Sequence, residues 1–159
     1  MGLKYNRNED DPMGDYHILI QFDMAADRST VHRAISTEQG IRSWWSSRTT
    51  GPDGSKHLEV SFPDAPLPFQ FTVTRDDQAR VEWRTGAFPP PWAGTTIRWD
   101  LSDAPPDAPP GSTTRLLFSH RDYDADNPVI PGVTPVWVQI ILRLKSYAET
   151  GKPDPFFTF

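Results

Sequence analysis

His120 is the strongest candidate for chemistry in this sequence. It ends the stretch "STTRLLFSH" (112–120), whose alternation places it on one strand face with Leu116 and Phe118. An imidazole that points into an apolar interior could orient a polar group of a ligand or act as a general base. The alternative is a histidine near a strand end that bonds to backbone or water. No acid–base partner accompanies it in the pattern, so we assign no catalytic residue.

The other histidines and an acidic loop do not predict a metal site. His17, His32 and His57 have no partner at metal-ligand spacing. The stretch "RDYDADN" (121–127) spaces three aspartates like the start of a calcium loop. Its sixth position is Asn rather than Gly and its twelfth is Val rather than Glu, so we interpret it as a solvated acidic loop. The chain has no cysteine, which excludes disulfide and thiolate chemistry. We expect neither a metal nor a cofactor.

Composition narrows the class of partner. A chain of 159 residues suits one domain. The net charge is -5, with acids and bases mixed along the chain, whereas phosphate binding needs a clustered positive surface. Nucleic acid is therefore not expected as a partner. No stretch resembles a signal peptide or approaches the roughly 20 apolar residues of a membrane span. We expect a cytoplasmic location and no membrane span.

Alternating and helical patterns predict the elements that position these side chains. Two short helices are expected within 25–45, with Asp27 or Ser29 capping the first. Ser36 followed by Gln39 matches a capping box for the second. About six strands are expected, at 15–24, 55–62, 68–74, 79–85, 94–101 and 112–120.

A long helix is expected last. Thr134 is a good N-cap, Pro135 suits the first helical position, and Gly151 is placed to end the helix. Its apolar stripe consists of Trp137, Ile140, Ile141, Leu144 and Ala148. The order of elements predicts an α+β fold, with helices against one face of an antiparallel sheet.

The sequence also resembles a known superfamily. The stretch "DRSTVHRAISTEQGIRSWW" is similar to the helical signature near the start of START-like (SRPBCC) proteins, whose birch-pollen-allergen-like fold is called helix-grip. "IRWDLS", "GSTTRLLFSHRDY" and "WVQIILRLKSYAETGK" follow in the same order. The branch it resembles is that of the C-terminal domain of the heat-shock-protein-90 ATPase activator, in which the two-helix segment ends in Trp-Trp, as at Trp44 and Trp45. The resemblance covers 15–152, with 1–14 as a flexible tail and 153–159 as an aromatic tail.

The resemblance implies a curved sheet that grips the C-terminal helix, with an apolar cavity between them. Relatives bind lipids, polyketides, hormones or other apolar molecules, some are polyketide cyclases, and one branch stimulates a chaperone. We therefore expect binding of a small apolar ligand that is lipid-like, polyketide-like or aromatic. A cyclase- or hydrolase-like enzyme in the same cavity is one alternative. A chaperone-associated module that stimulates a heat-shock-protein ATPase is another.

The expected ligand site is the inward face of the sheet and helix. Neighbours on a helix point about 100° apart, so one of Trp44 and Trp45 should close the core while the other borders the cavity. Tyr123 and Arg98 could add polar contacts, although alternation places Arg98 outward. The alternative is a filled core without a usable void. The predicted ligand-binding residues are Trp45, Phe71, Trp83, Trp99, Phe118, His120, Trp137 and Ile141.

The tail "KPDPFFTF" has three Phe among its last four residues. Such an apolar segment tends to dock on another surface. We expect it to cover the sheet edge of its own chain or a second subunit, so a homodimer is one of the predicted assemblies.

Overall fold

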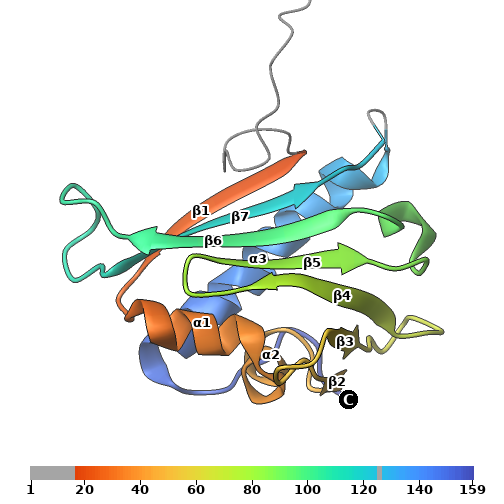
Figure 1. Cartoon of the computed structure of the whole chain (residues 1–159), viewed down its shortest axis with the longest axis horizontal. Helices are drawn as coiled ribbons and strands as arrows, with labels where there is room; N and C mark the ends of the chain where they lie inside the picture. Colours follow the sequence, from red (N-terminus) through yellow and green to blue (C-terminus); the bar gives the residue numbers. More distant parts are fainter. Residues whose placement is uncertain (1–16, 125–126) are drawn as a thin grey trace, which may run out of the picture.

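The computed structural model describes residues 17–124 and 127–159, so the predicted tail 1–14 lies outside the described residues. A seven-stranded antiparallel sheet has the order β1-β7-β6-β5-β4-β3-β2 (Figure 1). The strands are β1 (Ile18–Met24), β2 (Thr49–Thr50), β3 (His57–Val60), β4 (Phe69–Asp76), β5 (Arg80–Thr85), β6 (Thr96–Asp103) and β7 (Thr114–Arg121). The helices are α1 (Arg28–Ser36), α2 (Glu38–Trp44), the 3-10 helix η1 (Pro90–Trp92) and α3 (Val129–Thr150).

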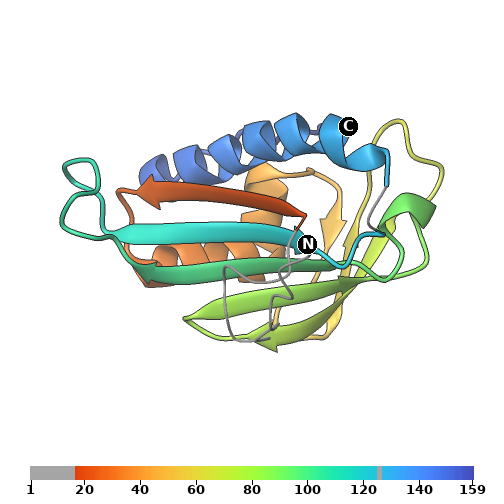
Figure 2. The ribbon, with the colours of Figure 1, turned by 90° about the horizontal axis from the view of Figure 1, so that it is seen from above.

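The α+β fold and the predicted strands are confirmed. Each predicted strand segment contains or overlaps an observed strand. The sequence did not predict β2, because a strand of two residues is too short to show an alternating pattern. On β7, Leu116, Phe118 and His120 are all buried, as their shared face predicted. Figure 2 shows the sheet curving around α3, which lies along one of its faces.

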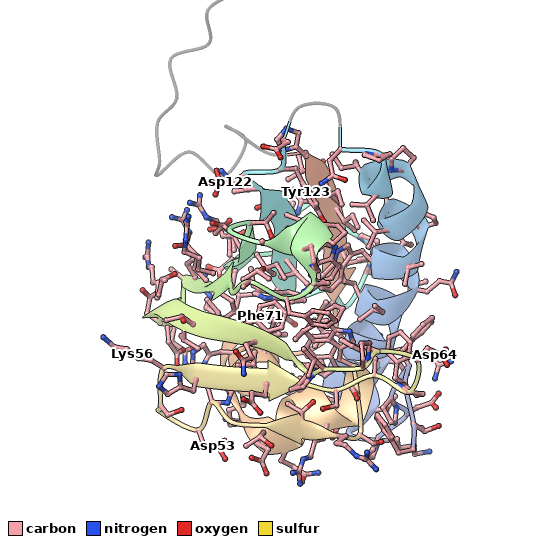
Figure 3. All side chains as sticks on the ribbon, turned by 90° about the vertical axis from the view of Figure 1, so that its right-hand side faces the viewer. Asp53, Lys56, Asp64, Phe71, Asp122 and Tyr123 are labelled. Atoms are coloured by element: carbon pink, nitrogen blue, oxygen red, sulfur yellow. The ribbon has the colours of Figure 1, made fainter. Side chains whose placement is uncertain are left out.

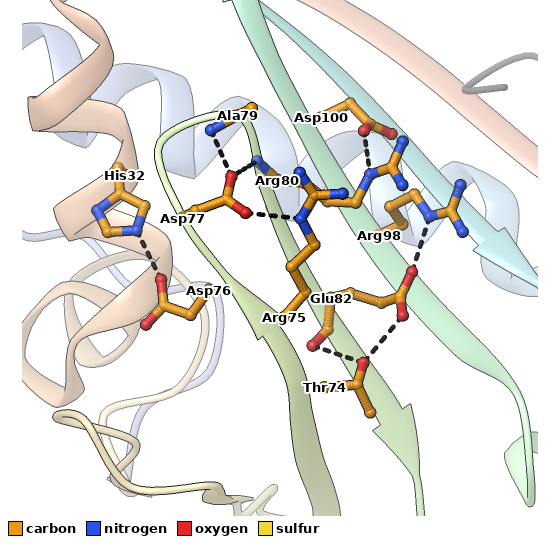
Figure 4. Close-up of polar contacts among 10 residues, drawn as sticks. All are labelled: His32, Thr74, Arg75, Asp76, Asp77, Ala79, Arg80, Glu82, Arg98 and Asp100. Atoms are coloured by element: carbon orange, nitrogen blue, oxygen red, sulfur yellow. Dashed lines mark hydrogen bonds and ion pairs between the residues drawn. The ribbon is translucent and has the colours of Figure 1, made fainter. Parts of the chain in front are cut away.

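The opposite face of the sheet carries charged pairs between neighbouring strands. Arg80 lies opposite Asp100 and Glu82 lies opposite Arg98 in the β5–β6 register. Each arginine donates from Nε to the facing carboxylate, at 2.6 Å for Arg80–Asp100 and 2.9 Å for Arg98–Glu82 (Figure 4). Cross-strand pairs of opposite charge support a sheet. Arg98 therefore points away from the interior, as its alternation indicated.

The predicted N-cap is correct for α1 and wrong for α2. The Asp27 carboxylate accepts a hydrogen bond from the backbone N–H of Thr30 at 2.7 Å, so it is the N-cap of α1. The capping box at Ser36 is wrong, because Thr37 is the N-cap of α2 and its Oγ1 accepts from the Gly40 N–H at 3.0 Å. Ser36 is instead the last residue of α1.

Gly40 brings α2 close to α1. A Cβ at this position would lie 2.5 Å from the Ala34 carbonyl oxygen, a distance that real side chains do not tolerate. The same carbonyl accepts a hydrogen bond from Trp44 Nε1 at 2.8 Å. The small residue thus permits a helix pair tight enough for the Trp44 indole to bond to α1.

The start of α3 differs from the sequence prediction. The helix begins at Val129 rather than after Thr134, and Pro135 lies inside it. Thr134 is not an N-cap, since its Oγ1 donates to the Ile130 carbonyl at 2.6 Å. The core packs against three residues near the start of this helix, Val129, Ile130 and Val133. Their burial extends the helix toward the N-terminus, beyond the capping signal at Thr134.

The end of α3 is as predicted. Gly151 has φ 72°, a left-handed conformation, and its N–H donates to the Tyr147 carbonyl at 2.7 Å. This is the glycine C-cap that the sequence indicated. Within the described part of the chain, no helix combines the length and the apolar character needed to cross a membrane.

Candidate ligand pocket

Three stacked tryptophans lie between the two short helices and the sheet. Trp45 stacks on Trp44 with ring centroids 5.9 Å apart and on Trp83 with centroids 6.0 Å apart. The sequence neighbours Trp44 and Trp45 stack because Trp45 is the C-cap of α2, where the backbone leaves the helix. Trp44, Trp45 and Trp83 are all fully buried.

The interior beside this stack is filled with rings. Trp99 contacts Trp83 with centroids 5.4 Å apart and Phe118 with centroids 4.8 Å apart. Phe118 in turn contacts Trp137 of α3 at 4.6 Å. These rings bring the sheet and α3 into direct contact, so the space between the middle of the sheet and α3 is packed core.

A pocket of about 290 Å³ lies at one end of this core. It is bounded by the first half of α3, the β3–β4 loop, the 3-10 helix η1 and the C-terminal tail. Of the predicted ligand-binding residues, Trp45 and Trp137 line it. Phe71 lines a separate hollow beside β3 and β4, and the others lie in the packed interior. The lining residues are Trp45, Phe62, Asp64, Ala65, Phe69, Trp92, Val133, Val136, Trp137, Ile140 and Phe157.

Trp92 is the main pocket residue that sequence reasoning missed. It is in "FPPPW", a proline-rich connection without strand or helix periodicity. Its ring is nearly parallel to that of Trp137, with an interplanar angle of 18° and centroids 5.6 Å apart. A large aromatic residue in a proline-rich loop was the available signal, since such loops seldom leave a tryptophan in water.

The aromatic tail docks on its own chain. The backbone N–H of Phe156 donates to the Trp44 carbonyl at 3.1 Å, and that of Phe157 donates to the Trp45 carbonyl at 2.9 Å. The N–H of Ser47 returns a bond to the Phe157 carbonyl at 3.0 Å. The Phe157 ring packs on Phe62 with centroids 4.8 Å apart. The tail therefore forms one wall of the pocket, beside the segment that follows α2.

On the interior side of the pocket wall, His120 links Trp92 and Trp137 by hydrogen bonds. Trp137 Nε1 donates to His120 Nδ1 at 3.2 Å, and an indole N–H can only donate, so Nδ1 carries no proton. The proton is then on Nε2, which lies 2.8 Å from Thr95 Oγ1, and Thr95 donates to the Trp92 carbonyl at 2.6 Å. The Tyr123 hydroxyl is 3.0 Å from Nδ1. Through this network His120 fixes both Trp92 and Trp137.

Burial keeps this histidine neutral. Loss of solvation, with a smaller contribution from the nearby His17, lowers the pKa of His120 from 6.5 to about 3. Burial likewise raises the pKa of the Tyr123 hydroxyl. His120 is fully buried, bonded at both ring nitrogens and not part of the pocket wall. Its geometry fits a positioning residue, bonded to side chains, better than a general base.

The acidic loop and the remaining histidines lie apart from this site. Asp122 accepts a hydrogen bond from Thr96 Oγ1 at 2.7 Å, and Asp126 lies outside the described residues. His32 is 2.6 Å from Asp76 on the surface between α1 and the β4–β5 hairpin. Across the described ranges, no three His, Asp or Glu side chains are grouped closely enough to hold a metal ion.

Comparisons with known proteins identify the fold. Neither a search of family models nor a search of curated proteins finds a match to this chain. Among solved structures, the Aha1 dimer from Colwellia psychrerythraea has a TM-score of 0.70 and 22% identity, covering 85% of this chain and 97% of that one. Protein SSP2350 from Staphylococcus saprophyticus has a TM-score of 0.68 and 17% identity, with 89% and 97% covered.

A third similar structure is DynU16, a protein of the dynemicin biosynthetic locus, with a TM-score of 0.69 and 18% identity over 89% of this chain and 50% of that one. Identities this low establish a shared architecture and leave the activity open. The order of strands, the two short helices and the long C-terminal helix all agree with the predicted resemblance. This chain therefore shares the fold of the Aha1 structure, as its resemblance to START-like (SRPBCC) proteins predicted.

Proposed function

We propose that this protein binds a small apolar molecule in the pocket between α3, η1, the β3–β4 loop and the tail. The observation that carries this proposal is the lining itself, which is aromatic and aliphatic apart from Asp64. Ligand sites are typically concave, mostly apolar and about 300–1,000 Å³ in volume. At about 290 Å³ the pocket is near the lower end of that range. We therefore expect a compact ligand of one to three rings rather than a long-chain lipid.

The pocket wall is held in place before any ligand arrives. The side chain of Trp137 and the backbone of Trp92 are bonded into the His120 network, and Phe157 is fixed by backbone hydrogen bonds of the tail. A preformed site spends less free energy on ordering side chains when it binds. In this proposal Trp45 and Trp137 contact the ligand, while Phe71, Trp83, Trp99, Phe118, His120 and Ile141 support the wall from behind.

The enzymatic alternative has less support in this site. Among the residues that the structure describes, Asp64 is the only ionisable one that lines the pocket. A cyclase- or hydrolase-like reaction uses a positioned acid and base, and His120 is sequestered behind Trp92 and Trp137. The carrier or sensor function accounts for the pocket without a second titratable group.

A pocket-filling substitution tests the proposed function. The probe is the neutral dye N-phenyl-1-naphthylamine, whose emission rises in apolar sites. Val136→Phe places a ring in the pocket and should reduce dye affinity at least about tenfold, since the added volume competes with the ligand. Val138→Phe is the matched control, because Val138 is the same residue type on the same helix but does not line the pocket.

The titration has two clear outcomes. Binding by the wild type and by Val138→Phe, together with loss in Val136→Phe, supports the proposal. Equal binding by all three proteins would place the dye elsewhere and contradict the proposal. Thermal unfolding of each variant shows whether the fold is intact before binding is compared.

The homodimer remains a separate proposal. The Colwellia structure is described as a dimer, and this chain carries apolar side chains on its surface, with Leu142 of α3 46% exposed and Phe159 54% exposed. Sedimentation velocity at several concentrations measures the association directly. A single species at the mass of one chain across that range would contradict it.

A further inference from the structure

The charge in the pocket lining is one-sided. Asp64 lies in this lining, and within residues 17–124 and 127–159 no lysine, arginine or histidine does. Figure 3 shows Asp64 on the loop that reaches from β3 and β4 toward α3. Its side chain is exposed, so the carboxylate is at the rim of the pocket rather than in its floor. A ligand that enters here meets one negative group and a set of rings.

Those rings come from six separate places in the chain. Aromatic faces carry partial negative charge, so a cation placed over them is attracted, most strongly by tryptophan. Quaternary ammonium groups are commonly recognised by several such rings together. The rings of this pocket belong to Trp45, Phe62, Phe69, Trp92, Trp137 and Phe157. Trp44 and Trp83 stack on the two faces of Trp45, so the cation–π argument applies to the other five rings.

We propose that the ligand of this pocket is an organic cation, with an apolar body and an amine or quaternary ammonium group directed toward Asp64. This inference rests on the proposed function and narrows it. Burial of the apolar body supplies most of the affinity, and the rings with the Asp64 carboxylate select the positive charge. Fatty acids and other carboxylates are disfavoured, because the single charge at the rim would repel them.

The arginines near the pocket do not compete for its rings. Arg48 stacks on Phe159, with Cζ 3.8 Å from the ring centroid, on the exposed end of the tail. Arg143 is paired with Asp154 at 2.8 Å and lies over Phe156 at 5.8 Å. Both contacts use tail rings that do not line the pocket, so neither arginine covers a ring of the pocket lining.

Two probes of the same shape distinguish the contribution of charge to the binding affinity from that of apolar burial. Benzyltrimethylammonium and neopentylbenzene differ only in the replacement of the central N⁺ by carbon. Each is titrated against protein loaded with N-phenyl-1-naphthylamine, and displacement gives the two affinities. We expect the cation to bind roughly tenfold more tightly than its neutral isostere, a difference in the range of a cation–π contact with a partly screened ion pair.

Asp64→Asn should reduce the affinity for benzyltrimethylammonium about threefold to fivefold and leave that for neopentylbenzene unchanged. Asp107→Asn removes an exposed aspartate from the β6–β7 loop, away from the pocket, and should change neither affinity. Both replacements remove one negative charge from the chain. Their difference therefore isolates the local effect of Asp64 from that of net charge.

The outcomes distinguish the two proposals. If neopentylbenzene displaces the dye as well as the cation does, the ligand class is wrong and the apolar pocket stands. If Asp64→Asn and Asp107→Asn weaken the cation equally, Asp64 is not its partner and the inference fails. If neither probe displaces the dye, the inference fails, and the proposed function is decided separately by the dye titration of Val136→Phe.

Discussion

Two ends of the same aromatic interior have different packing. In the filled part, Trp45 has a ring against each face, with Trp44 on one side and Trp83 on the other. At the pocket end, Trp92 stacks on Trp137, and both also border open space. The residue types are alike in the two regions. What differs is whether the neighbouring segments supply enough side-chain volume to fill the space.

The boundary between the two regions is set by loops and by the tail. The sheet and the long helix carry large residues at the centre of the grip, so their contact excludes a void there. At the open end the walls are η1, the β3–β4 loop and the segment around Phe157, whose side chains leave the pocket unfilled. A helix-grip protein can thus keep a packed core and a pocket with the same kind of side chain.

The largest effect is expected in the filled region. Trp83→Ala removes a fully buried ring that contacts Trp45, Phe71 and Trp99, and should lower the free energy of unfolding by about 3–5 kcal/mol. Urea denaturation followed by circular dichroism measures it. Trp83→Phe is the control and should cost less, because it keeps a ring. A loss below about 1 kcal/mol for Trp83→Ala would mean that this region is not close-packed.

The next effect concerns the polar network behind the pocket. His120 has a pKa of about 3 in the folded chain and about 6.5 when unfolded, so the unfolded state takes up the proton first. The contribution of neutral His120 to the free energy of unfolding is complete above about pH 6.5 and is lost as the pH falls toward about 3. The slope is about 1.4 kcal/mol per pH unit within that window.

Urea denaturation between pH 7 and pH 4 measures this dependence. His120→Gln keeps hydrogen-bonding groups but does not titrate, so its unfolding free energy should fall less steeply than that of the wild type. Carboxylates such as Asp23 contribute equally to both proteins and cancel in the comparison. Parallel pH profiles would show that His120 is not the buried neutral group described above.

The smallest effect is expected at the pocket wall. Phe157→Ala removes a half-buried ring that packs on Phe62, and should lower the free energy of unfolding by about 1–2 kcal/mol. Phe159→Ala is the control two residues later. That side chain is 54% exposed and its contact with Arg48 is a surface cation–π contact, so the change should cost less than about 1 kcal/mol. Equal effects would indicate that the tail does not dock through Phe157.

The fold was predictable because its signals are local and repeated. Alternation in the strands and the stripe of α3 each use several residues, so one irregular position does not hide them. The start of α3 was not predictable in this way. Thr134 and Pro135 form a good local start signal, but Val129 and Ile130 gain more by packing on the core as a longer helix.

The candidate site was predicted only where it coincides with regular elements. Trp137 was found because it belongs to the helical stripe, and Trp45 because it follows a recognisable helix pair. Trp92 and Phe157 come from segments without a strand or α-helix period. Phe62 continues the alternation of the predicted strand 55–62 but lies two residues past the end of β3, in the β3–β4 loop. No pattern within such segments indicates which distant ring each will meet.

The sequence by itself determined which residues are apolar, how they alternate and therefore which face of each strand and helix is buried. These properties depend on neighbours within a few positions along the chain. The tertiary structure alone decided where the buried faces fill space and where they leave a pocket. That outcome depends on the summed volumes of side chains from segments as distant as the β3–β4 loop, η1 and the C-terminal tail, which meet only after the chain has folded.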